Sequence, residues 1–362
     1  METYSNETFD EERALYGSTG LLVDHCRFEG PADGESAMKE SRDITVKDSY
    51  FDLRYPFWHD THVVITDSLM TEHCRAALWY SKDVRMERTK AYGIKALREC
   101  ENIEIRDCDI CSPEFGWFND SVRMKDTTAE SEYFMMHSKK LYFENVKMRG
   151  KYSFQYIEDS EFVKCTFDTK DAFWHAKNVV VRDSLVKGEY LAWYCENVTF
   201  INCTIVGTQP LCYCKGLKLV DCKMIDADLS FEKSEVDATI IGSVLSIKNP
   251  KSGEIRLSHA DELIMDDPDA KAVILFDEPE ERQKCPCCGY YTLLGSEGDT
   301  AYEICPVCYW ENDISGEYET SYSGANDMTL AEGRANYEKY GACDPRFVKK
   351  CRPPKKEEQK HA

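Results

Sequence analysis

The chain has 362 residues, more than one compact core normally holds, so we expect two or more domains. Its 42% hydrophobic and 31% charged residues exclude a disordered chain, and no apolar run reaches the ~18 residues that a membrane-spanning helix needs. A net charge of −21 repels polyanions and therefore disfavours nucleic acid as a partner.

The N-terminal residues METYSNETFDEERALYG carry neither the basic nor the apolar region of a secretory signal, so the cytoplasm is the expected compartment. Eighteen cysteines in such a chain indicate buried thiols and metal ligands instead of disulfides. Residues 8–17, TFDEERALYG, are expected to form a short helix with Asp10 near its start and Gly17 beyond its end. We interpret residues 1–20 as an N-terminal cap.

A repeat with a period of 19 residues follows the cap. Aligned copies such as IEIRDCDI, VRMKDTTA, VVVRDSLV and LKLVDCKM succeed one another at this spacing. Eight of them begin, in seven steps of 19 residues, at Val84, Ile103, Val122, Leu141, Ser160, Val179, Val198 and Leu217. Together with earlier copies at longer spacings and one later copy, residues 21–245 hold about twelve.

Each copy has the pattern of a short strand and a bend. Its first and third positions are mostly apolar and alternate with polar residues, as in a strand with one buried face. The fifth position is mostly Asp or Asn, which suits a bend. The sixth position is small and includes five cysteines, Cys26, Cys108, Cys165, Cys203 and Cys222, which we interpret as structural thiols inside a tight corner. The repeat predicts an all-β fold, a right-handed parallel β-helix over residues 21–245.

Two aromatic columns occur late in the repeats. Five of the six tryptophans share the first column: Trp58, Trp79, Trp117, Trp174 and Trp193. The next column holds His59, Tyr80, Phe118, His137, Tyr156, His175, Tyr194 and Tyr213. Because neighbouring residues of a strand point to opposite faces, we expect one column inside and the other outside. Arg98 and Gln155 favour an outward tryptophan column, whereas the small residues two places later favour an inward one.

An outward tryptophan ladder would suit the C–H faces of sugar rings, so these five tryptophans are candidate ligand-binding residues. The alternative is ladder packing that stabilises the solenoid without any ligand. His137 and His175 stand two coils, ~10 Å, apart and are too distant to share one metal ion. No carboxylate pair stands out from the bend residues, so no catalytic residue is assigned.

A C-terminal module follows the solenoid. Residues 246–282 contain less regular strands and are expected to form a C-terminal cap and linker. In residues 283–348, the spacing Cys285-x2-Cys288 and Cys305-x2-Cys308 predicts a small zinc-ribbon-like α+β module with one structural zinc ion. Cys287 is a spare thiol that could replace Cys285 or Cys288.

The end of the module contains a predicted helix and a basic tail. Thr329 and Glu332 form the pattern of a capping box before LAEGRANYEKY, and Gly341 ends that helix. Residues 349–362 form a basic tail that could contact an acidic partner.

Two resemblances cover nearly the whole chain. Residues 1–280, with NETFDEERALYG and the LWYSKD, FWHAKN and WYCENV strands, resemble an uncharacterised bacterial family, domain of unknown function 3737, which is similar to right-handed β-helix proteins. Residues 285–357, with CPCCGYYTL and ICPVCYWEND, resemble the cysteine-rich CPCC domain. The second resemblance implies metal binding at Cys285, Cys288, Cys305 and Cys308. Neither implies an activity.

We therefore expect a cytoplasmic, non-catalytic binding or scaffold protein whose partner is a glycan or a protein, with neither nucleic acid nor membrane as a partner. The alternative is a carbohydrate-active β-helix enzyme, a polysaccharide lyase, hydrolase or epimerase. Most polymeric glycans lie outside the cell, which argues against that alternative.

Overall fold

The computed structural model describes residues 2–277, 282–295, 300–313 and 320–359. The chain divides into two compact units, Met1–Asp277 and Glu278–Ala362, and each is described by itself.

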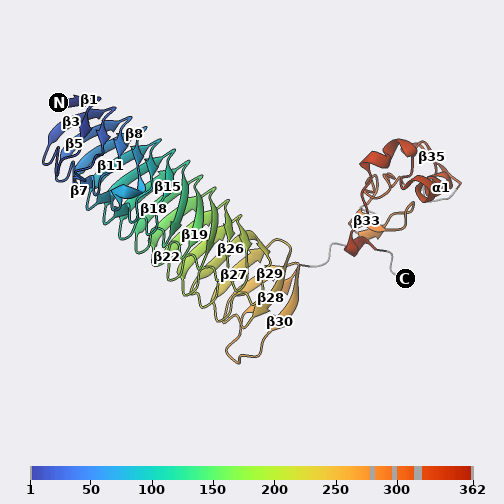
Figure 1. The fold of residues 1–362 in the computed structure, drawn as a ribbon. Coiled ribbons are helices and arrows are strands. Elements are labelled where there is room, and N and C mark those ends of the chain that lie inside the picture. The colour runs from blue at the N-terminus through green and yellow to red at the C-terminus, as the bar shows by residue number, and fades with distance from the viewer. Residues whose placement is uncertain (1, 278–281, 296–299, 314–319, 360–362) are drawn as a thin grey trace. The chain divides into compact units, whose positions relative to one another are not determined.

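The first unit is a parallel β-solenoid of about 14 turns (Figure 1). One long parallel sheet runs along it, and successive strands pair in register at the repeat spacing, as where Val84 lies opposite Ile103. Its strands are β1 (Glu2–Ser5), β3 (Thr19–Asp24), β5 (Arg42–Lys47), β8 (Thr61–Thr66), β11 (Lys82–Glu87), β14 (Glu101–Arg106), β16 (Asp120–Lys125), β18 (Lys139–Glu144), β20 (Glu158–Val163), β22 (Lys177–Arg182), β24 (Glu196–Ile201), β26 (Leu217–Ile225), β27 (Val236–Ile240), β29 (Glu254–Leu257) and β31 (Val273–Phe276). The parallel β-helix predicted from the repeat is confirmed.

A second row of shorter strands follows the bend of each coil. It consists of β2 (Thr8–Phe9), β4 (Arg27–Phe28), β6 (Tyr50–Phe51), β9 (Leu69–Met70), β12 (Lys90–Ala91), β15 (Asp109–Cys111), β17 (Thr128–Glu132), β19 (Lys147–Lys151), β21 (Thr166–Lys170), β23 (Leu185–Lys187), β25 (Thr204–Val206) and the end of β26. A third row is β7 (Phe57–Trp58), β10 (Leu78–Trp79) and β13 (Leu97–Arg98). β28 (Ser243–Lys248) pairs with β30 (His259–Ile264) near the C-terminal end.

The bend residues have the left-handed backbone expected of them. Asp107 has a φ of 51° and Asp126 one of 50°. After each bend the small column turns inward, and its side chains bond neighbouring coils: Cys108 Sγ lies 3.5 Å from the carbonyl oxygen of Met86, and Ser68 Oγ accepts a hydrogen bond from Ser49 N at 3.1 Å. The five cysteines of this column are buried, as structural thiols should be.

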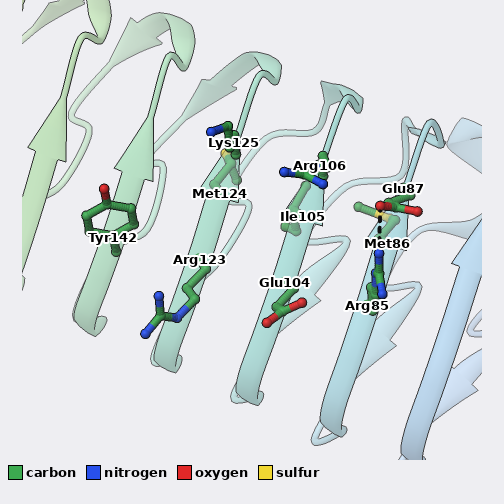
Figure 2. Close-up of a pocket in the computed structure, with 10 residues that line it drawn as sticks. All are labelled: Arg85, Met86, Glu87, Glu104, Ile105, Arg106, Arg123, Met124, Lys125 and Tyr142. Atoms are coloured by element: carbon green, nitrogen blue, oxygen red, sulfur yellow. Dashed lines mark hydrogen bonds and ion pairs between the residues drawn. The ribbon is translucent and has the colours of Figure 1, made fainter.

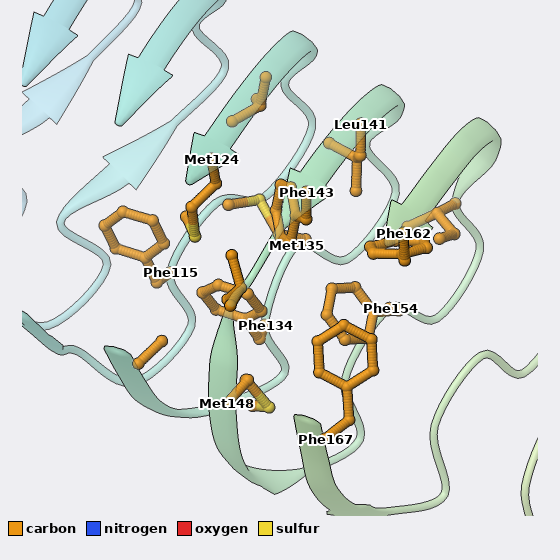
Figure 3. Close-up of a cluster of buried hydrophobic side chains, with 14 of the residues drawn as sticks. Phe115, Met124, Phe134, Met135, Leu141, Phe143, Met148, Phe154, Phe162 and Phe167 are labelled. Atoms are coloured by element: carbon orange, nitrogen blue, oxygen red, sulfur yellow. The ribbon is translucent and has the colours of Figure 1, made fainter. Parts of the chain in front are cut away.

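The core is a continuous set of apolar side chains enclosed by the coils. In its middle, Phe134, Phe143, Phe154 and Phe162 converge from successive coils (Figure 3). The ring centres of Phe154 and Phe162 are 5.0 Å apart, and all four side chains are fully buried. Each coil therefore buries its apolar residues against those of the next coil.

The helix predicted at residues 8–17 is wrong. Thr8–Phe9 forms β2, which pairs with β4, and turns follow it. The ring of Phe9 stacks on that of Phe28 at 5.0 Å, and the Asp10 carboxylate accepts hydrogen bonds from the backbone N–H groups of Ala32 and Asp33. Pairing with the next coil buries Phe9 better than an isolated short helix could, so tertiary packing overrides the local pattern.

The expected cap after residue 246 also differs from the structure. β29 pairs with β27 and β31 pairs with β29, so these residues extend the long sheet by further coils. Because the spacing of these strands is irregular, the sequence pattern did not show that they continue the repeat.

The second unit is a small α+β module. It contains the antiparallel pair β32 (Arg282–Lys284) and β33 (Tyr291–Leu294), the pair β34 (Tyr322–Ser323) and β35 (Met328–Thr329), helix α1 (Leu330–Tyr340), and the 3₁₀ turns η3 (Pro345–Lys350) and η4 (Lys356–Glu358). The capping box of Thr329 and Glu332 and the left-handed Gly341 bound α1 as predicted. A Cβ at Gly333 would lie 2.7 Å from the buried Trp310 ring, so glycine lets α1 pack closely on the module core.

Candidate functional site

A cluster of four buried cysteines is the centre of the C-terminal module. Two similar turns supply them. Gly289 N donates to the carbonyl oxygen of Cys285 at 2.9 Å in one, and Tyr309 N donates to that of Cys305 at 2.7 Å in the other. Gly289 and Tyr309, each directly after the second cysteine of its pair, have φ values of 77° and 66°. The two turns thus present their thiols in the same way.

The four thiols face one another. Cys285 Sγ lies 3.6 Å from Cys308 Sγ, and Cys288 Sγ lies 3.6 Å from Cys305 Sγ. All four sulfurs lie within 4.8 Å of one another, and all four residues are buried. Zn–S bonds of ~2.3 Å in a tetrahedron would separate the sulfurs by about 3.8 Å. The structure therefore brings together the four predicted cysteines at spacings that fit one metal ion.

The surroundings of Cys305 favour the thiolate form that a metal needs. Hydrogen bonds from Cys285 foremost, and from Cys288, lower the pKa of Cys305. Thr292 Oγ1 lies 3.0 Å from Cys305 Sγ and can donate its proton to that thiolate. Thr292 was not predicted from the sequence, because no motif identifies a residue that contacts a metal-ligating cysteine without binding the metal itself. Cys287 is buried beside the cluster but does not belong to it.

The predicted tryptophan column lies on the outside of the solenoid and is half-buried. Each indole N–H donates to a backbone carbonyl of the next coil, as Trp174 Nε1 does to Tyr190 and Trp193 Nε1 to Gln209, at 2.7 and 2.8 Å. Trp174 and Trp193 stack with ring centres 5.3 Å apart and an interplanar angle of 3°. The hydrogen bonds and the stacking tie adjacent coils together.

The expectation that one aromatic column points in and the other out is wrong, because both point outward. Residues of the second column have left-handed backbone, with φ of 58° at Phe118 and 56° at His137. A left-handed residue breaks the two-residue alternation of a strand, so the inward position moves to the next residue. The small column two places after the tryptophans, which includes Ser81 and Cys100, is buried as expected.

The second column forms a ring ladder on the surface. It runs without a break through six stacked rings, with ring-centre separations of 4.6 to 5.1 Å: Phe118, His137, Tyr156, His175, Tyr194 and Tyr213. Burial lowers the pKa of His137, which favours a neutral imidazole between two rings. Because the rings stack on one another, a ligand would meet their edges and not the flat faces that suit a sugar.

The outer face of the long sheet carries a shallow hollow of about 250 Å³ that sequence reasoning did not find (Figure 2). Charges of both signs line it, including Arg85, which bonds Glu87 at 2.8 Å, and Lys125, which pairs with Glu144 at 3.0 Å. Arg123 lies 5.9 Å from the ring centre of Tyr142. Alternating charges along a solvated sheet face account for this arrangement.

Comparison with known proteins places these features in a family. The family model described as "Protein of unknown function (DUF3737)" matches residues 2–274, and the model "Cysteine-rich CPCC" matches residues 283–358. The chain belongs to the DUF3737 family. Its C-terminal module, with the four-cysteine cluster, is the part that matches the CPCC family. No curated protein matches the chain.

Solved structures of similar fold are distant. The A-module of mannuronan C-5 epimerase from Azotobacter vinelandii is 10% identical, with a TM-score of 0.33 over 66% of this chain and 88% of that one. Tailspike protein 3 of bacteriophage CBA120 is 9% identical, with a TM-score of 0.31 over 77% and 55%. The surface adhesin PfbA of Streptococcus pneumoniae is 10% identical, with a TM-score of 0.29 over 71% of each. Structural similarities this weak support no inference about function. In the part of the chain that the structure describes, no helix is both long and apolar enough to cross a membrane.

Proposed function

We propose that this DUF3737 member is a binding protein without chemistry of its own, in which a solenoid scaffold is joined to a module stabilised by a structural zinc ion. The observation that carries the proposal is the closed cluster of Cys285, Cys288, Cys305 and Cys308. Four thiolates favour zinc over hard cations, and they fill a tetrahedron, so no position is left for a substrate or an activated water.

The thiols of the solenoid support the proposal that the protein works in the cytoplasm. Cys195 Sγ and Cys214 Sγ each lie 2.9 Å from a backbone carbonyl oxygen and are buried. Burial raises the pKa of Cys100 to about 12, so that thiol stays protonated and unreactive. A reducing compartment preserves thiols that pack and bond in this way.

The surface charge supports a protein or a neutral glycan as the partner. The net charge of −21 repels nucleic acid and anionic membrane surfaces. The carbohydrate-active enzyme remains the second candidate function. The tryptophan column does not favour it, because stacking covers ring faces within the pairs Trp58–Trp79 and Trp174–Trp193. The observation that favours it is a paired carboxylate and imidazole, Asp52 and His73, beside a hollow in the N-terminal coils.

Metal analysis of the full chain tests the zinc centre. We expect about one zinc per chain, lost in the Cys305→Ser, Cys308→Ser double variant and retained in Cys287→Ser, whose thiol lies outside the cluster. Limited proteolysis should then cut residues 283–358 of the double variant while residues 2–277 stay protected. A purified chain free of metal, with its module still resistant to protease, would contradict the proposal.

A further inference from the structure

Two coils near the N-terminus are longer than the others. Leu21 pairs with Ile44, and Val63 pairs with Val84, so these coils span 23 (44 − 21) and 21 (84 − 63) residues, whereas Ile44 and Val63 are 19 (63 − 44) apart. In both, the extra residues fall between the second and third strand rows: after β4 in the first coil and after β9 in the second. Insertions in a solenoid that share one corner often build its binding face.

The solenoid has a hollow of about 810 Å³ at this corner. Residues from five successive coils line it, from Asp33 in the first to Pro113 in the last. The backbone is specialised here: Arg75 has a φ of 51° and a ψ of −114°, a region that L-residues rarely adopt. A Cβ at Gly93 would lie 2.2 Å from the carbonyl oxygen of Arg75, so only glycine allows the two coils to approach this closely. Strained backbone tends to collect at binding sites.

A fixed imidazole lies on the rim of the hollow. Asp52 Oδ1 lies 3.0 Å from His73 Nδ1 and also accepts a hydrogen bond from Thr71 Oγ1. The hydrogen bond to Asp52 raises the pKa of His73, which favours the protonated ring. With Nδ1 held by the carboxylate, Nε2 is left to donate to a ligand.

The charges on the rim balance. Asp33 Oδ2 accepts a hydrogen bond from Arg54 Nη2 at 2.9 Å, and Asp52 is matched by His73. Glu72 and Arg75 add one charge of each sign. A balanced rim does not favour a strongly charged ligand over a neutral one, but it offers many donors and acceptors.

The hollow also has an apolar part. Leu53 is buried there, whereas the Ile94 side chain is 41% exposed and Pro113 is exposed. A site of this size with an apolar lining and a few fixed polar groups suits a small organic ligand. A molecule with C–H faces and many hydroxyl groups, but no net charge, matches both the apolar lining and the polar rim.

We infer that this hollow, at the corner formed by the two long coils, binds a neutral saccharide through the imidazole of His73, the carboxylate and guanidinium groups of the rim, and the Ile94 side chain. The inference rests on the proposed binding function and assigns it a site and a ligand class. The site is separate from the tryptophan column, whose members do not line the hollow.

Isothermal titration calorimetry of the full chain tests this inference. The probes are neutral hexasaccharides of glucose, mannose, xylose and N-acetylglucosamine, with hexagalacturonate as the charged comparison. We expect at least one neutral probe to bind with a micromolar to millimolar Kd. His73→Ala and Ile94→Ser should each weaken it about tenfold or more. His25→Ala is the matched control, because its imidazole bonds Asp24 at 2.8 Å outside the hollow and its loss should change nothing.

Three results would overturn the inference: no binding of any neutral probe up to about 10 mM, binding of hexagalacturonate alone, or binding that both hollow variants leave unchanged. The last would leave the proposed binding function standing and refute only the site. Mass spectrometry of the recovered probe separates the two proposals further. A chemically altered sugar whose conversion is lost in His73→Ala would support the hollow as its site but refute a function without chemistry.

Discussion

The guanidinium of Arg98 lies 5.2 Å from the ring centre of Trp79, in the column where other coils place tryptophan. On its other side it lies 5.5 Å from the ring centre of Trp117. A planar cation thus takes the place of a ring and keeps the stack continuous across a coil that has no tryptophan.

Replacing Arg98 should therefore destabilise the solenoid. We expect Arg98→Ala to lower the free energy of unfolding by about 1–2 kcal/mol, since the cation–π contacts with Trp79, Trp117 and Phe118 are lost. Arg98→Trp should restore most of the stability by completing the column. Urea unfolding of both variants measures this, with Arg123→Ala as the control because Arg123 faces a single ring at 5.9 Å. Equal losses in Arg98→Ala and Arg123→Ala would mean that the stacked position has no special role.

The buried carboxyl of Asp60 should make stability depend on pH. Its Oδ1 accepts a hydrogen bond from Ser41 N at 2.8 Å, whereas Oδ2 has no partner in the described part of the chain. Burial raises the pKa of Asp60 to about 8. The folded state then holds a proton that the unfolded state releases near pH 4, so the free energy of unfolding should fall as pH rises from about 4 to about 8, by up to about 5 kcal/mol.

The chain itself offers the matched substitution for this test. Asn119 occupies the same inward column and accepts the same kind of bond, from Cys100 N at 2.8 Å. Urea unfolding at pH 5 and pH 8 measures the fall in the free energy of unfolding between these two values. Asp60→Asn should abolish this fall, and Asn119→Asp should make it larger. A pH profile that Asp60→Asn leaves unchanged would show that another group causes it.

Thr292 should strengthen metal binding through Cys305. Thr292→Val removes the hydroxyl that lies 3.0 Å from the sulfur, and we expect zinc affinity to fall about tenfold. Competition of the full chain with a chromophoric chelator measures the change. Thr292→Ser keeps the hydroxyl and should keep the affinity. If the valine and serine variants have the same zinc affinity, the hydroxyl of Thr292 does not strengthen metal binding.

Glu358 should anchor the C-terminal residues of the module. Its side chain is fully buried and accepts a hydrogen bond from Arg352 at 2.7 Å and from Arg282 at 3.4 Å. Glu358→Gln removes the buried carboxylate charge that faces Arg352, so we expect a loss of about 3 kcal/mol in module stability. The control is Glu357→Gln, because that neighbour is exposed. Similar protease sensitivity of the two variants would refute the anchoring role.

Glu358 should also make the stability of the module sensitive to acid. The hydrogen bond from Arg352 lowers the pKa of Glu358 in the folded module. Its contribution is therefore complete above the ordinary glutamate pKa and is lost as pH falls through the lower, folded value. Proteolysis of the module at decreasing pH should show this loss in the native chain and not in Glu358→Gln.

The repeat and the cysteine spacing predicted most of the architecture because both are periodic or local signals. The columns of Val84 and Met86, and the pairs beginning at Cys285 and Cys305, are set by spacing alone. The outward position of both Trp117 and Phe118 could not be read from alternation, because it depends on a left-handed residue that several residue types fill. The hollow beside His73 could not be predicted from the repeat, because it is built where two coils depart from the 19-residue period. The residues that line it come from several coils, and the period does not show which of them meet.

The constant coil length has an evolutionary consequence. From Val84 to Leu217 every paired column repeats after 19 residues, so deleting residues 141–159 would place Ser160 where Leu141 stood and bring each stack back into alignment. The solenoid can therefore lengthen or shorten by whole coils, ~4.8 Å at a time, through duplication or deletion of a gene segment. The two long coils at the N-terminal end do not share this freedom, because removing either one would dismantle the hollow that spans them.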